Sequence, residues 1–245
     1  MVLDRPALKQ RAKSIVKGAR VSAYLFTLLY LGISLVINGA DTYISGGVGG
    51  YFAQLGLSVP AWLRVPEFPG LLVTFVSVAV WLLTVLLQGG CCLYHLGVNR
   101  GERRDYGTLL DGFAFAGKLI WLNLVMTVFV ALWTMLFVIP GFVAAYRYRF
   151  AVYNLCEDPD MGAMAALRMS KAQTAGFKWQ LFVLDLSFFG WSLLSVLTLG
   201  ILSIWINPYY QQSDVMFYRT ICAFKGIDPL GAPEDGGQFR PTDTF

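Results

Sequence analysis

The sequence predicts an all-α membrane protein, a polytopic transmembrane helix bundle of about six spans. Of its 245 residues, 56% are hydrophobic and only 14% are charged, and the mean hydropathy is +0.58. An average soluble domain carries about 25% charged residues, so the deficit of charge indicates a lipid environment. Each span needs roughly 20 apolar residues, and the chain is long enough for about six.

The number of spans follows from the basic residues. Four long stretches contain no Lys, Arg, Asp or Glu, namely 21–40, 68–99, 119–146 and 186–213. Four spans and a cytoplasmic N-terminus would place the basic segment 147–179 outside, against the positive-inside rule. Six spans remove this conflict if Pro140-Gly141 and Gly200 mark turns, because glycine and proline commonly break helices.

The predicted spans are about 21–38, 70–97, 119–138, 142–156, 179–199 and 201–222. Both termini then lie in the cytoplasm, together with sixteen of the 19 basic residues. The fourth helix is too short to cross the membrane alone. At about 1.5 Å per residue it is roughly 22 Å long, whereas the hydrocarbon core of a bilayer is about 30 Å thick. We expect it to be broken, re-entrant or buried in protein.

Three regions follow from composition. Residues 1–20 form a basic cytoplasmic segment in which Leu8, Ala12, Ile15 and Val16 share one helical face, as in helices that lie on anionic membranes or orient a first span. Residues 21–225 form the transmembrane domain, and 226–245 a disordered cytoplasmic tail rich in Gly, Pro and acids. The only sizeable external element is the loop 39–69. No aromatic-studded basic groove follows the N-terminal segment, so nucleic acid is not an expected partner.

A weak internal repeat accompanies this order. Three times a Gly and a basic residue lead into an apparent helical hairpin, and each hairpin ends near a tyrosine, at Tyr94, Tyr153 and Tyr218. The repeat predicts three copies of an amphipathic segment followed by a hairpin.

Catalytic and metal-binding motifs are missing from the sequence. The four cysteines form no CxxC pair, and one histidine cannot make a metal site. We therefore expect no metal, no cofactor and no enzymatic activity. The cysteines should pack as small apolar side chains, and His95 should be hydrogen-bonded and partly solvated.

The informative feature is charge inside the predicted spans, at Arg147, Arg149, Asp185 and Asp214. Such residues cost about 2.5–3.5 kcal/mol each on insertion scales and are functional candidates by default. Asp185, Asp214 and Arg149 have similar predicted depths, about 9–12 Å from the inner surface, where opposite charges can pair. Arg147 and Arg149 point to opposite sides of one helix, so only one of them can face the aspartates.

The segment 207–213 around Asp214 is polar and contains Pro208, as in interrupted helices that line cavities. We therefore predict a polar binding site in the inner half of the bundle, made of Arg149 or Arg147 with Asp185, Asp214 and Tyr210. In the alternative interpretation these charges only lock the helices together.

The sequence also resembles a known family. The resemblance is carried mainly by the second half, in Leu136-Phe137-Val138-Ile139-Pro140-Gly141, Tyr146-Arg147-Tyr148, Asp158-Pro159, Ser170-Lys171, Gly176-Phe177-Lys178-Trp179, Asp185-Leu186-Ser187-Phe188, Gly190-Trp191, Leu197-Thr198-Leu199-Gly200-Ile201, Trp205, Pro208-Tyr209 and Phe217-Tyr218. Arg11-Ala12-Lys13 and Leu110-Asp111-Gly112-Phe113 are similar as well. These motifs resemble the bacterial membrane family called domain of unknown function 975 (DUF975). The resemblance implies a multi-span protein of the bacterial plasma membrane and transfers no activity or site residue.

Three function classes remain. The first is a non-enzymatic protein that supports envelope maintenance or a partner complex, with membrane lipids and a protein partner or a second copy as its contacts. The second is a transporter, a lipid-handling protein or the membrane part of an exporter that uses the polar site. The third is an intramembrane enzyme with Asp185 and Asp214 as an acid pair, whose spacing fits no protease or transferase motif.

Overall fold

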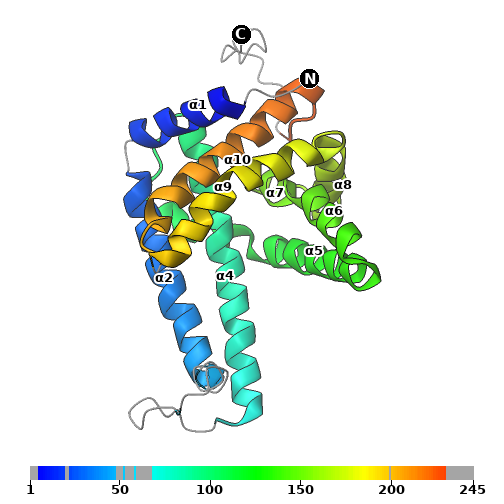
Figure 1. Cartoon of the computed structure of the whole chain (residues 1–245). Helices are drawn as coiled ribbons and strands as arrows, with labels where there is room; N and C mark the ends of the chain where they lie inside the picture. The colour runs from blue at the N-terminus through cyan, green and yellow to red at the C-terminus, as the bar shows by residue number, and fades with distance from the viewer. Residues whose placement is uncertain are drawn as a thin grey trace.

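The computed structural model describes residues 5–19, 22–47, 52, 58, 68–198 and 200–229, and the regular elements in these residues are all helical. The predicted all-α fold is confirmed. In chain order the elements are α1 (Arg5–Gly18), α2 (Ala23–Ile44), α4 (Gly70–Asn99), the 3₁₀ helix η2 (Tyr106–Phe115), α5 (Ala116–Leu136), α6 (Val138–Tyr148), α7 (Ala151–Glu157), α8 (Ala163–Thr174), α9 (Lys178–Leu197) and α10 (Ser203–Lys225) (Figure 1).

Within the described residues, four helical segments are long and apolar enough to cross a membrane: Ala23–Ile44, Gly70–Asn99, Tyr106–Leu136 and Lys178–Leu197. Many of their large apolar side chains are exposed, such as Leu35, Leu71 and Val196. Exposed apolar surface on this scale marks contact with lipid or protein, and these helices indicate a membrane protein. The remaining two predicted spans correspond to α6–α7 and to α10, which are shorter or more polar.

The helices form three hairpins, each preceded by a short helical segment. The first hairpin is α2 and α4 after α1, the second is α5 with α6 and α7 after η2, and the third is α9 and α10 after α8. This order is the one that the internal repeat predicts. The two ends of the chain meet, because α1 packs on α10, and η2 packs back on the preceding helix α4.

The two turns predicted inside the apolar stretches have different outcomes. Gly200 has a positive φ of 84° between α9 and α10, as predicted. The turn predicted at Pro140-Gly141 is wrong, because the chain turns at the extended residue Phe137 (φ −158°, ψ 145°). Pro140 lies in the first turn of α6, where proline is tolerated because its missing N–H would have no intrahelical partner. Gly141 permits close packing, since a Cβ there would lie 2.2 Å from Thr134 Oγ1.

Other predicted boundaries also need correction. Helix α2 extends beyond residue 38 into the predicted loop, where Ser77 of α4 donates a 2.6 Å hydrogen bond to Asp41. The fourth predicted helix begins earlier than predicted and is broken into α6 and α7, and a broken helix is one of the expected outcomes. The predicted interruption at Pro208 is wrong, because α10 continues through it. Pro208 lies in the second turn, and its ring removes only the one backbone hydrogen bond that residue 208 would donate to the Ile204 carbonyl. Most of the loop 39–69 and the predicted disordered tail from residue 230 lie outside the described residues.

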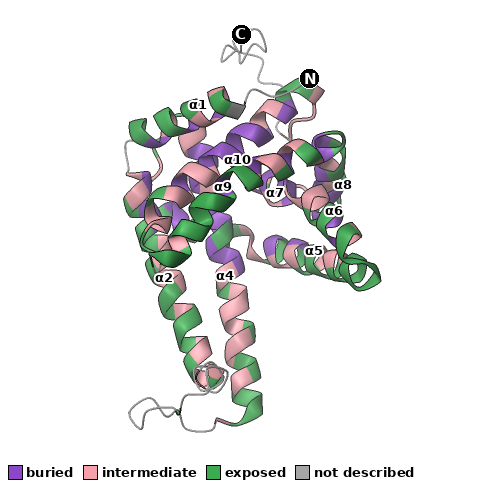
Figure 2. Ribbon diagram, viewed as in Figure 1, coloured by how far each residue is buried: buried purple, intermediate pink, exposed green. Residues whose placement is uncertain are grey.

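The core is concentrated at the end of the molecule that carries α1 (Figure 2). Buried positions of α4 begin only at Val85, and those of α10 include Val215, Phe217 and Ile221. All four cysteines are free and buried, as expected for small packed side chains. The far ends of the hairpins carry few buried residues, so they diverge from this shared core.

Buried polar side chains fix the helices within the core. His95 of α4 hydrogen-bonds Gln212 of α10 at 3.3 Å and is 2% exposed, so the prediction of partial solvation is wrong. Asn154 of α7 is linked by two 2.9 Å hydrogen bonds to Gln173 of α8 and accepts one from Tyr218 of α10. Polar groups buried in this way hold a unique arrangement because each would be costly to leave unpaired.

Helix α4 approaches η2 so closely that Gly90 should be essential for stability. A Cβ at Gly90 would lie 2.1 Å from the Leu109 carbonyl oxygen, which is backbone and cannot move aside. We expect Gly90→Ala to lower the free energy of unfolding by about 1–3 kcal/mol, measured as a lower thermal midpoint in detergent. The matched change Gly117→Ala, where nothing lies within 4 Å, should not lower it. Equal midpoints for the two variants would contradict this packing.

Candidate functional site

A helix break in the second hairpin positions the central side chain of the site. Helix α6 ends at Tyr148, and α7 begins at Ala151. Ser170 of α8 satisfies the freed backbone groups, since its hydroxyl donates to the Arg147 carbonyl at 2.9 Å and accepts from the Phe150 N–H at 3.1 Å. The break is therefore anchored to α8, with Arg149 at the junction.

Arg149 joins the second hairpin to both helices of the third. Its Nη1 and Nη2 donate to the two carboxylate oxygens of Asp185 on α9, at 2.6 and 3.0 Å. Its Nε donates to Asp214 Oδ2 on α10 at 3.2 Å, and Nη2 also reaches the Tyr210 hydroxyl at 2.7 Å. The Arg149 side chain is 15% exposed, and charge-assisted bonds of this kind are the strong ones in proteins.

Three tyrosines complete the cluster. Tyr146 and Tyr210 donate to Asp185, at 2.8 and 2.9 Å, and Tyr153 donates to Asp214 Oδ2 at 3.0 Å. Each oxygen of Asp185 thus accepts two hydrogen bonds. Asp214 Oδ1 lies 2.9 Å from Arg149 Nη2 but is buried without an aligned donor among the described residues. We call Arg149, Asp185, Asp214 and the tyrosines 146, 153 and 210 the charge cluster.

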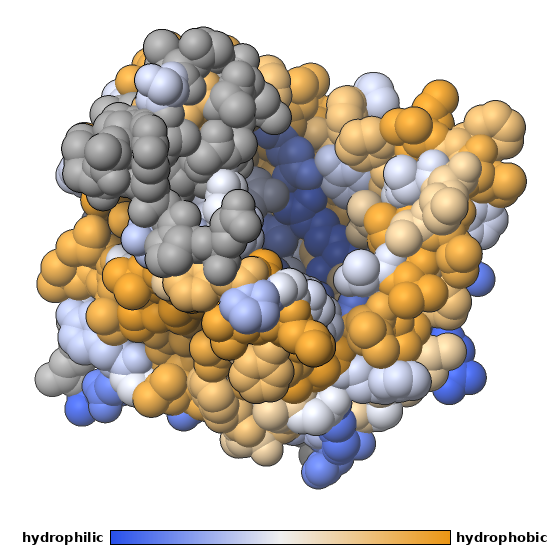
Figure 3. Space-filling model, turned by 90° about the horizontal axis from the view of Figure 1, so that it is seen from below, coloured by the Kyte–Doolittle hydropathy of each residue, from blue (hydrophilic) through white to orange (hydrophobic). Residues whose placement is uncertain are grey.

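The charge cluster lines a cavity of about 490 Å³, within the usual size of ligand sites. All three hairpins contribute to its wall, with Tyr30 and Gln88 from the first, Met126 from the second and Gln211 from the third. Viewed from the side opposite α1, the molecule shows a hydrophilic hollow surrounded by hydrophobic side chains (Figure 3). The site is therefore a polar cavity, open on one side, within an apolar exterior.

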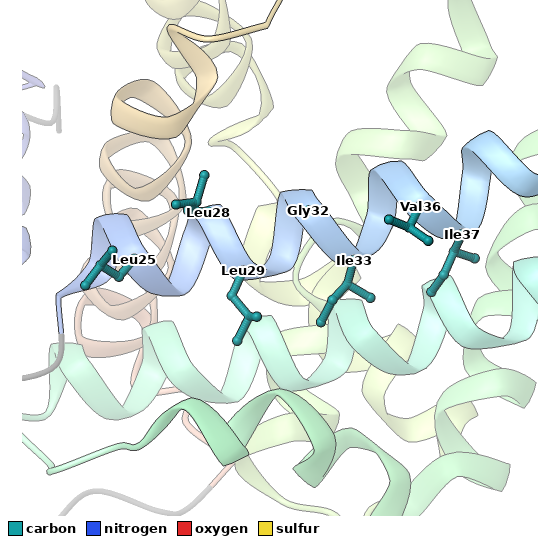
Figure 4. Close-up of a pocket in the computed structure, with 7 residues that line it drawn as sticks. All are labelled: Leu25, Leu28, Leu29, Gly32, Ile33, Val36 and Ile37. Atoms are coloured by element: carbon teal, nitrogen blue, oxygen red, sulfur yellow. The ribbon is translucent and has the colours of Figure 1, made fainter.

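A second hollow on the surface has a different character. It runs along one face of α2, and its described lining residues all belong to that helix: Leu25, Leu28, Leu29, Gly32, Ile33, Val36 and Ile37 (Figure 4). This apolar face suits lipid chains and offers no group for recognition of a polar ligand.

Four of the five predicted site residues lie together: Arg149, Asp185, Tyr210 and Asp214. Arg147 does not join them. Its carbonyl accepts from α8, and its side chain is absent from the cavity wall, as opposite helix faces require. The prediction missed Tyr146 and Tyr153. These residues lie three before and four after Arg149, a spacing that places helical side chains on one face.

The described residues contain no group of three or more His, Cys, Asp or Glu that could hold a metal ion. Within the described wall, the cavity offers a guanidinium, two carboxylates, hydroxyls and amides. Such groups hold a polar ligand by charge and hydrogen bonding.

Comparison with known proteins supports the family resemblance. The family model described as "Protein of unknown function (DUF975)" matches residues 122–225, and the predicted resemblance is confirmed over this segment. The segment contains the whole charge cluster, while the similar motifs at residues 11–13 and 110–113 lie outside it. No curated protein and no solved structure matches the chain.

The geometry makes Arg149 the residue whose loss should be most damaging. Removal of one partner from a buried ion pair costs about 3–5 kcal/mol, and here two carboxylates lose their cation. We expect Arg149→Gln to lower the free energy of unfolding by about this amount, measured by thermal unfolding in detergent. Arg147→Gln, two residues away, should change it by less than about 0.5 kcal/mol.

A variant without any of the three charges distinguishes two effects of Arg149→Gln: the loss of the arginine side chain itself, and the unpaired charge that it leaves on the two aspartates. In the triple variant Arg149→Gln, Asp185→Asn, Asp214→Asn no carboxylate remains unpaired, and much of the lost stability should return. A triple variant no more stable than Arg149→Gln alone would show that unpaired charge is not the cause.

Proposed function

We propose that this chain is a non-enzymatic membrane protein that binds a polar ligand, a lipid headgroup or a small solute, in the cavity between its hairpins. The observation that carries the proposal is the charge cluster on the wall of an open cavity. Ionisable groups inside membrane spans are rare and are functional-site candidates by default, because burying them is costly. Lipid handling of this kind is also one route to a role in envelope maintenance.

The cavity beside the charge cluster favours ligand binding over a purely structural role. Charges that only lock helices together need partners but do not need a cavity. Here a cavity of about 490 Å³ lies beside the charge cluster. The side-chain amides of Gln88 and Gln211 also line this space, and no hydrogen bond joins either to another described residue. These amides can therefore form hydrogen bonds to a ligand in the cavity.

The arrangement of the side chains supports binding without catalysis. A nucleophile in such a site needs a base within hydrogen-bonding reach. Cys91 and Cys92 lie on the wall, but His95 is bonded to Gln212 in the core. Both carboxylates are held by the same guanidinium, which suits neither to act as a free general acid.

A structural or partner-supporting role is the second candidate, and one observation favours it. The cluster satisfies nearly all of its own hydrogen bonds, since Asp185 alone accepts four. In this role Arg149 serves to lock the second hairpin to the third, and the apolar faces serve lipid, a partner or a second copy.

We further propose a multi-pass protein of the bacterial plasma membrane with both termini in the cytoplasm. The distribution of basic residues supports this orientation, because they are frequent in α1, in the segment 100–104 and in α8 itself, at Arg168 and Lys171. Helix α1 packs against α10 at the end of the molecule opposite the open side of the cavity (Figures 1 and 3). The cavity would then open toward the outer leaflet or the outside.

Bulk introduced into the cavity should abolish binding without disturbing the cluster. Ala145 is exposed on the cavity wall, whereas Val143, two residues away, is exposed elsewhere. We expect native mass spectrometry of gently purified protein to show a retained ligand on wild type and on Val143→Trp, but none on Ala145→Trp. Only bulk lipid on all three proteins would favour the structural role.

Orientation can be tested with a membrane-impermeant maleimide. Asp160, before α8, and Gly70, at the start of α4, are both exposed. In intact cells Gly70→Cys should be labelled and Asp160→Cys should not, until the membrane is opened. The unsubstituted protein, whose four cysteines are buried, serves as the blank. Labelling of Asp160→Cys from outside would refute six spans with cytoplasmic ends.

A further inference from the structure

We infer that the ligand of the cavity carries a positively charged ammonium group. This inference rests on the proposed function and specifies the chemistry that the site recognises. It follows from the balance of charge, from the hydrogen bonds that already engage the arginine and from the aromatic rings of the wall.

The first argument is the balance of charge. Among the described residues of the cavity wall, Arg149 is the only basic side chain, and Asp185 and Asp214 are the acidic ones. One guanidinium facing two carboxylates leaves one negative charge in excess. Because a net charge surrounded by apolar helices is costly, the site favours a ligand that brings one positive charge.

The second argument is the pattern of hydrogen bonds. Both oxygens of Asp185 are already occupied, and Arg149 spends its donors on the two aspartates and Tyr210. Asp214 Oδ1 is buried and lies 2.9 Å from Arg149 Nη2, so this aspartate too is paired with the arginine. A phosphate or carboxylate would therefore meet two carboxylates and an arginine already engaged, whereas an ammonium is attracted by both carboxylates.

The third argument is the surrounding aromatic groups. The rings of Tyr146 and Tyr210 already flank one cation, with Arg149 Cζ 5.8 Å from each ring centroid. Tyrosine faces attract ammonium groups in the same manner. The amides of Gln88 and Gln211 provide donors for the polar remainder of the ligand. An ethanolamine-type lipid headgroup and a free amine share this chemistry.

The test compares lipids that differ at the ammonium. Phosphatidylethanolamine, its N-acetyl derivative and phosphatidylglycerol are each offered to the delipidated wild-type protein, and retention is measured by native mass spectrometry. We expect phosphatidylethanolamine to be retained at least tenfold more than either lipid without the positive charge. Asp214→Asn should remove this preference, while Asp111→Asn, an exposed aspartate outside the cavity, should keep it.

The comparison of lipids on wild type decides the inference even if Asp214→Asn does not fold. Thermal stabilisation by ethanolamine alone, lost in Ala145→Trp, would support the inference with a free amine as the source. Equal retention of all three lipids on wild type, abolished by Ala145→Trp, would overturn the ammonium while the proposed cavity binding stands. Retention unaffected by Ala145→Trp, with no response to ethanolamine, would overturn both.

Discussion

The arrangement of this protein depends on one guanidinium that two carboxylates share. A positive charge among apolar helices is stable only when acceptors reach it, and Arg149 finds them on α9 and α10. That requirement fixes the second hairpin against the third. The helix break before α7 serves the same end, because its backbone groups bond to Ser170 while the Arg149 side chain turns to the aspartates. The first hairpin joins through His95 and Gln212.

The cavity results from uneven packing along the hairpins. Near α1, glycines let the helices approach closely, as at Gly90 beside Leu109, and buried amides link α7, α8 and α10. Farther out the helices carry apolar side chains that face outward, and few contacts hold the hairpins together (Figure 2). The charge cluster lies where the packed core meets this open region. It therefore both closes the core and forms part of the cavity wall.

Much of this could be predicted from the sequence because a membrane imposes simple rules. Apolar length and basic residues indicate the hairpins, and matched depth indicates that Asp185 and Asp214 meet an arginine. The choice of Arg149 over Arg147 needs the rotation of α6, which depends on contacts with α8. The turn at Phe137 could not be predicted, because proline and glycine break helices in some places and start or pack them in others. For the same reason, the sequence alone does not predict that α10 continues through Pro208.

The most direct test of this account measures whether Arg149 holds the hairpins in place. Spin labels at Val143 on α6 and Phe189 on α9, both exposed, report the distance between the second and third hairpins by pulsed electron resonance. The account predicts one narrow distance distribution that broadens in Arg149→Gln and stays narrow in Arg147→Gln. An unchanged distribution in Arg149→Gln would show that packing alone fixes the hairpins, and it would remove the central role assigned to the arginine.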